Sequence, residues 1–134
     1  MLEATLYKLI PEDVNTFDKL TGGDPYRFHR WHNDGHGVEC LYYHFMARDG
    51  VKTYKKRLLV SEFRAALCQL RNVGILSRKA FSKACPISAS DGLCSFAVCG
   101  RILEALHVAT YSGRNGFKLT NATEAMRLLQ EKQS

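Results

Sequence analysis

Residues 103–120 read LEALHVATYSGRNGFKLT, and this stretch decides how the second half of the chain is interpreted. Two short runs of β-forming residues, VATY and FKLT, flank the turn sequence SGRNG. Glycine and asparagine are typical of tight hairpin turns, because they tolerate the backbone conformations that such turns require. The pattern therefore predicts a small β-hairpin that follows a helix directly.

The region before this hairpin has the spacing of helices. Apolar residues recur every three to four positions in residues 61–73, with Ser61 as the expected N-cap and Gly74 as the stop. A second helix is expected from Ser77 to Cys85, because Pro86 cannot continue it.

A third helix is expected near residues 90–106, capped by Ser88 or Ser90, and a last helix after the hairpin, capped by Asn121 or Thr123. The third helix is unusually apolar. Four residues are expected on its exposed side, and only one of them is basic: Ser90, Asp91, Ser95 and Arg101.

The order helix, helix, turn, helix and two-stranded wing over residues 61–120 resembles a winged helix-turn-helix domain. The resemblance rests on the helix that follows ISASDG and on the wing LEALHVATYSGRNGFKLT. It implies that the third helix lies in a DNA major groove and that the wing reaches the DNA backbone or the minor groove.

The first sixty residues predict a small α/β extension of this core. A strand is expected over residues 3–10, a helix over 11–20 and a loop over 24–37. An antiparallel pair over 38–46 and 51–60 is expected around Asp49-Gly50. We therefore expect a single α+β domain, with an extension (1–60), a winged-helix core (61–120) and a C-terminal helix (121–134).

The positive charge is concentrated in the second part of the chain. Residues 1–50 hold five Lys/Arg against eight Asp/Glu, whereas residues 51–134 hold fourteen against five. A basic surface of this kind favours a polyanion such as DNA, although an ordinary solvated surface is the alternative. The cations expected to contact phosphate are Arg78, Lys79, Lys83, Arg101, Arg114 and Lys118, with Lys55, Lys56 and Arg57 extending the surface.

Residues 28–40, FHRWHNDGHGVEC, concentrate histidine in a loop-like stretch. His29, His32 and His36 could converge on a zinc ion, with Cys40 or Asp34 as the remaining ligand. Zinc-bound water would then make a hydrolytic, metal-dependent enzyme conceivable. A binding loop whose rings stack on bases, or a packed structural loop, explains the same residues without a metal.

Other function classes lack their signatures in the sequence. The chain has no phosphate-binding glycine loop, nucleophile elbow or HExxH motif, and its five cysteines show no paired spacing. It has no apolar run long enough to span a membrane and no signal-peptide pattern, so we expect a cytoplasmic protein without a membrane partner. The expected function is that of a noncatalytic DNA-binding regulator or accessory protein. The alternatives are a protein-interaction module or homodimer on the same fold, and the metal-dependent enzyme.

Overall fold

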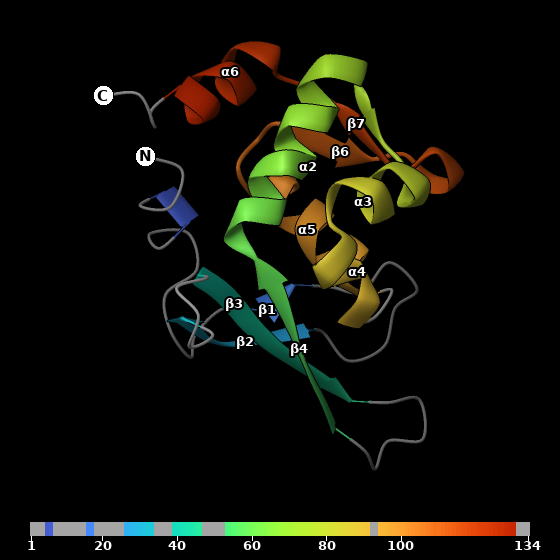
Figure 1. Ribbon diagram of the computed structural model, residues 1–134. Helices are drawn as coiled ribbons and strands as arrows, with labels where there is room; N and C mark the ends of the chain where they lie inside the picture. The colour runs from blue at the N-terminus through green and yellow to red at the C-terminus, as the bar shows by residue number, and fades with distance from the viewer. Residues whose placement is uncertain are drawn as a thin grey trace.

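The computed structural model describes residues 5–6, 16–17, 26–33, 39–46, 53–91 and 94–130 of the chain. Within these ranges the protein is α+β, with two antiparallel sheets and a set of helices that lies above the larger sheet in Figure 1. None of the helices in these ranges combines the length and the apolar character that crossing a membrane requires.

The larger sheet has the strand order β1-β2-β3-β4. Its strands are β1 (Thr16–Phe17), β2 (Tyr26–Asn33), β3 (Glu39–Met46) and β4 (Thr53–Leu59). The antiparallel pair over 38–46 and 51–60 is confirmed as β3 and β4, with Leu41 opposite Leu58. Leu41, Tyr43 and Leu58 are buried, so this hairpin contributes one wall of the hydrophobic core.

Three predictions for the first part of the chain were wrong where the structure describes it. Thr5 and Leu6 are helical instead of extended. Thr16–Phe17 forms strand β1 where a helix was expected, and most of the expected loop is strand β2. The two strands arise from tertiary pairing, because β2 adds to the edge of β3 and β1 adds to β2, and this pairing overrides local propensity.

Helix α2 (Val60–Val73) follows β4 without a loop. Its N-cap position is therefore Leu59, which makes no side-chain cap, and the prediction of Ser61 as the cap was wrong. The predicted stop is confirmed, because Gly74 adopts a left-handed conformation with φ of 90° and its N–H donates to the Leu70 carbonyl at 2.7 Å.

Two short helices come next, α3 (Arg78–Ala84) and α4 (Pro86–Asp91). The predicted cap of α3 is confirmed, because the Ala80 N–H donates to Ser77 Oγ at 3.1 Å. Helix α4 was not predicted. Pro86 ends α3, but a proline is also well suited to the first position of a helix, where no N–H bond is needed.

Helix α5 (Cys94–Ala105) leads into the predicted hairpin, which is present as β6 (Ala109–Tyr111) and β7 (Phe117–Leu119) around the 3-10 turn η1 (Gly113–Asn115). A two-residue strand, β5 (Ile75–Leu76), adds to β7 and gives the sheet order β5-β7-β6. We call residues 109–119 the wing. Because β5 immediately precedes α3, this pairing brings the start of α3 beside the wing.

Helix α6 (Ala122–Gln130) closes the described chain and packs on α2. Its predicted cap by Asn121 is confirmed by the Glu124 N–H, which donates to Asn121 Oδ1 at 3.0 Å. The core between the helices and both sheets is continuous and includes the ring contacts of Phe96 with Phe81 and with Phe117.

Candidate nucleic-acid interface

Helix α5, the expected recognition helix, is buried along its first half. Each residue from Ser95 to Gly100 is buried, and the exposed fraction of Ser95 is 0%. The Tyr43 hydroxyl of β3 lies 2.7 Å from Ser95 Oγ, because the larger sheet packs against the beginning of this helix. The expectation that Ser95 lies on an exposed side was therefore wrong.

Arg101 is the basic residue of α5, and its guanidinium has partners within the fold. Its Nη1 lies 2.7 Å from Glu104 Oε1, with both side chains about three-quarters buried. The second oxygen of Glu104 accepts the Tyr111 N–H at 2.8 Å, and the Arg101 guanidinium lies 5.9 Å from the Tyr111 ring centroid. Arg101 and Glu104 therefore join α5 to β6.

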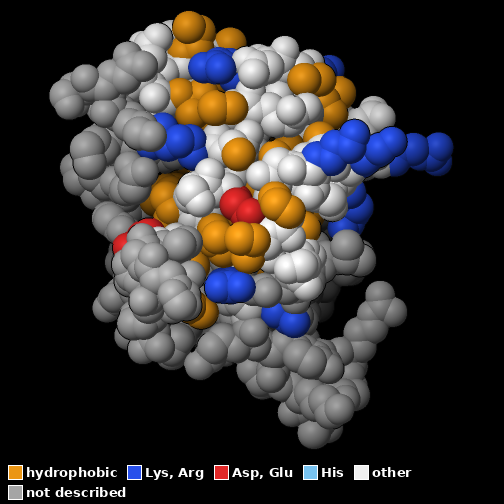
Figure 2. Space-filling model, in the orientation of Figure 1, with side chains coloured by type: hydrophobic (Ala, Val, Ile, Leu, Met, Phe, Trp, Pro, Cys, Tyr) orange, Lys and Arg blue, Asp and Glu red, His pale blue; other side chains and the backbone are white. Residues whose placement is uncertain are grey.

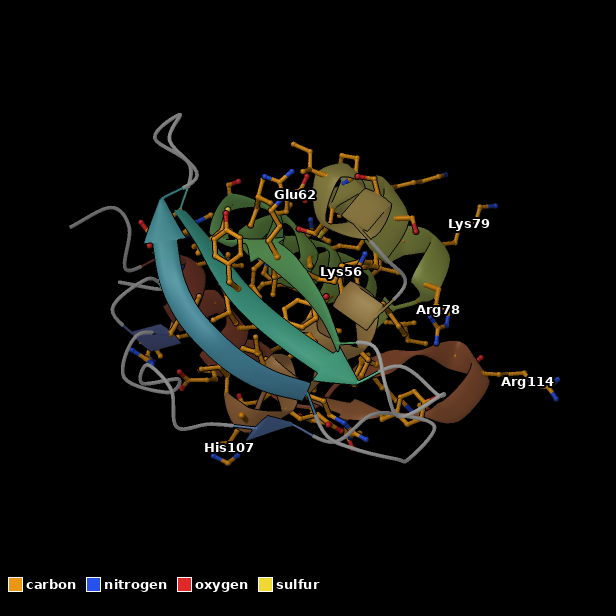
Figure 3. The ribbon with its side chains drawn as sticks, turned by 90° about the horizontal axis from the view of Figure 1, so that it is seen from below. Lys56, Glu62, Arg78, Lys79, His107 and Arg114 are labelled. Atoms are coloured by element: carbon orange, nitrogen blue, oxygen red, sulfur yellow. The ribbon has the colours of Figure 1, made fainter. Side chains whose placement is uncertain are left out.

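The exposed cations lie beside this helix, on α3 and on the wing. Five of the predicted residues occupy exposed positions of these two neighbouring elements: Arg78, Lys79, Lys83, Arg114 and Lys118. We call this set the α3–wing cluster. In Figure 3 the labelled Arg78, Lys79 and Arg114 lie along one edge and point away from the body, while His107 lies on the opposite side. Figure 2 shows a large group of Lys and Arg side chains at the corresponding margin.

Arg78 combines exposure with a fixed position. Its guanidinium carbon lies 4.9 Å from the centroid of the Phe96 ring, a distance at which a cation is attracted to an aromatic face. Ring packing holds Phe96 between Phe81 and Phe117. The aromatic core therefore orients the Arg78 side chain at the surface between α3 and the wing.

The cluster has no acidic partner among the residues that the structure describes. Three of the glutamates in those ranges are occupied elsewhere: Glu62 binds backbone N–H groups of α4, Glu104 pairs with Arg101, and Glu124 pairs with Arg127. No ion pair is present between these carboxylates and the α3–wing cluster. Within the described ranges, no carboxylate is therefore shown to neutralise the positive charge of the cluster.

The predicted extension of the basic surface lies on β4. Lys56 and Arg57 are half-buried there, on the larger sheet, and both make further interactions within the fold. The backbone of Lys55 pairs with that of His44 on β3. These three residues belong to a different element from the α3–wing cluster.

The described parts of the histidine-rich stretch, residues 28–33 and 39–40, lie in the larger sheet. His29 and His32 are on β2, whose pairing with β3 is irregular between Phe28 and Arg30, and His32 is opposite the buried Cys40. His36, and the side chains of His29 and His32, lie outside the described residues. The described part of the chain contains no group of three metal-binding side chains, so the zinc site stays a prediction.

The buried thiols are unsuited to nucleophilic catalysis. Burial, with the nearby charge of Glu62, raises the pKa of the Cys85 thiol to about 12. Burial also raises the pKa of Cys99 well above its ordinary value. A catalytic thiol needs a lowered pKa to provide thiolate at neutral pH, and these two cysteines have the opposite property.

Sequence reasoning missed a hollow beside the cluster, between α2 and α3. Gln69 of α2 and Ser77 line it together with Lys79 and Lys83. The spacing of four between the two lysines indicates that they share a side of α3. The contribution of Gln69 becomes visible only when α3 is packed on α2.

Comparisons with families of known proteins, with curated proteins and with solved structures gave no match to this chain. The α3–wing cluster and the adjoining hollow are therefore interpreted from their own geometry and charge.

Proposed function

We propose that this protein is a noncatalytic nucleic-acid-binding protein on a winged-helix fold, and that it contacts DNA phosphates through the α3–wing cluster. The helix order α2, α3, α5, followed by the hairpin β6-β7 and by a sheet with the order β5-β7-β6, supports this fold. Helix α4 is an addition between the second and the third helix of the domain.

A single observation carries the proposal: five exposed cations lie on two neighbouring elements, while Glu62, Glu104 and Glu124 are engaged elsewhere. Lysine and arginine side chains that replace condensed counterions supply most of the affinity in sequence-independent DNA binding. The Arg78 guanidinium is also held in place, which lowers the entropy lost on contact.

The burial of α5 determines the kind of recognition that we propose. A helix that reads bases in the major groove must present several side chains to the base edges. The first half of α5 is buried and Arg101 is paired with Glu104. We therefore infer contacts with the DNA backbone and little dependence on base sequence.

Fluorescence-anisotropy binding to duplex DNA over a salt series tests the proposal. Five phosphate contacts give a slope of log K against log [salt] of about −4.5, and the double variant Arg114→Ala/Lys118→Ala should reduce it to about −2.7. Arg127→Ala is the matched control, because this arginine lies on α6 and pairs with Glu124 at 2.5 Å. It should leave the slope unchanged.

Two results would count against the proposal. An absence of binding at low salt would reject DNA as the partner, and an unchanged slope in the double variant would remove the wing from the interface. Duplexes of unrelated sequence should bind within about tenfold of one another, because each specific base pair would otherwise contribute about 1–3 kcal/mol.

The cysteines support a cytoplasmic location for this function. The described cysteines Cys40, Cys68, Cys85 and Cys99 are all free thiols. Free thiols are usual in reducing compartments, whereas the cysteines of secreted proteins are commonly paired in disulfides.

A further inference from the structure

The hollow between α2 and α3 has the size and the lining of a small-ligand site. Its volume is about 380 Å³, within the range of about 300–1,000 Å³ that is common for such sites. Ala80 and Ala84 also line it, and their short side chains leave the space open where α3 faces Gln69 of α2.

The polar groups of the hollow can all donate hydrogen bonds. Lys79 and Lys83 lie one helical turn apart and each carries an ammonium group. Ser77 Oγ accepts the Ala80 N–H at 3.1 Å, which leaves the hydroxyl proton to be donated outward. The Gln69 amide adds an NH₂ donor, and the described lining residues include no carboxylate. A ligand that matches this lining must be an anion with several acceptor oxygens.

We propose that the hollow binds a phosphate monoester, and that its natural ligand is the terminal phosphate of a nucleic-acid strand; the choice of nucleic acid rests on the proposed function. Lys79 points outward in Figure 3, and its flexible side chain must turn toward the hollow to join the donors of Gln69 and Ser77. Together these donors suit the three terminal oxygens of a phosphate better than the two of a carboxylate. A monoester carries about −1.5 to −2 charges at pH 7, which matches two ammonium groups better than the single charge of an internal phosphodiester.

Binding to two forms of one short duplex tests this inference. One form carries a 5′-phosphate and the other a 5′-hydroxyl, and each is labelled at the far end for anisotropy. The phosphorylated form should bind about fivefold more tightly, since two exposed charge contacts are involved. Lys79→Gln/Lys83→Gln should lose this preference. Arg114→Gln/Lys118→Gln should weaken binding of both forms and keep the ratio between them.

The failure of this inference can be distinguished from the failure of the proposed function. Equal affinity of the two duplex forms for the unaltered protein, with steep salt dependence, would overturn the terminal-phosphate site and leave DNA binding intact. A preference that survives in Lys79→Gln/Lys83→Gln would likewise overturn it. Because both lysines are exposed, this variant should retain its helical circular dichroism, which confirms that a lost preference reflects the site.

Amide chemical shifts provide a readout that does not depend on duplex binding. Adenosine 5′-monophosphate should shift the amides of Ala80 and Ala84, whereas adenosine should not. Such shifts without any DNA binding would support the phosphate site and reject the proposed function. An acidic peptide without phosphate that produces the same shifts at equal concentration would overturn the proposal in favour of a carboxylate site.

Discussion

Glu62 should be among the residues on which the stability of the helical part depends most. Its side chain is 8% exposed, and its two carboxylate oxygens accept the N–H groups of Ile87 at 3.0 Å and of Ser88 at 2.7 Å. These N–H groups lie in the first turn of α4, where no intrahelical partner exists. Glu62 of α2, which is labelled in Figure 3, therefore caps a different helix.

Glu62→Ala would leave both N–H groups without their acceptor. Ile87 is 44% exposed and water can reach its N–H, but Ser88 is fully buried, so its N–H bears most of the penalty. A buried hydrogen bond to a charged group contributes about 1.5–3 kcal/mol, and we expect a total loss of about 3 kcal/mol. Glu62→Gln retains one acceptor oxygen and should lose about half as much.

Urea unfolding followed by circular dichroism measures the loss in the free energy of unfolding for each variant. In a separate thermal scan, the melting temperature should fall by about 4 °C for each kcal/mol lost. Glu124→Gln is the control, because Glu124 is an exposed carboxylate paired with Arg127, and its removal should cost less than about 1 kcal/mol. Equal losses for Glu62→Gln and Glu124→Gln would refute the capping role of Glu62.

Two further predictions concern the packing of α5 and the buried thiols. A Cβ added at Gly100 would lie 1.9 Å from the Phe117 ring, so Gly100→Ala should displace the wing and cost about 3 kcal/mol by thermal denaturation. Gly113→Ala, which meets no atoms but has a φ of 66°, should cost only about 1 kcal/mol, and equal costs would contradict the close approach at Gly100. The pKa of Cys85 is raised from about 9 to about 12, so the unfolded chain loses this proton first and stability should fall as pH rises between these values. Cys85→Ala should make that fall less steep in a pH series of urea unfolding, and an unchanged decline would exclude this thiol as a cause.

The elements that the sequence predicted well are those with a strong local pattern. The helix over 61–73 with its stop at Gly74, the pair β3-β4 and the wing hairpin each follow from residue spacing and turn residues within one segment. Strand β5 has two residues and exists because β7 is beside it, so no local pattern could predict it. Strand β2 was missed for the same reason, since its sequence is polar and aromatic and its partner is β3.

The residues of the candidate site likewise include some that a local pattern predicts and some that only the folded structure reveals. Lysines and arginines at exposed helical and turn positions could be named from the sequence, because charged side chains seldom lie fully buried. Arg101 was expected to contact phosphate but is paired with Glu104. The i, i+3 spacing of these two residues is a signal for such a helical ion pair. The burial of Ser95 depends on Tyr43, fifty-two positions earlier in the chain, and only the folded structure brings these two residues together.

The burial of α5 and the exposure of the cluster have a common physical origin. Residues 95–100 of α5, with the sequence SFAVCG, are buried, and their apolar side chains belong to the hydrophobic core. These residues are therefore not accessible to a binding partner. Charged side chains cannot follow them into the core without partners, and Arg101 is retained near the core boundary because Glu104 lies 2.7 Å away. Arg78, Lys79, Lys83, Arg114 and Lys118 lie instead at exposed positions of α3 and the wing, the elements beside the buried helix. On the proposed function, a buried α5 reads few bases, and the contact of the α3–wing cluster with a polyanion should depend on charge more than on base sequence.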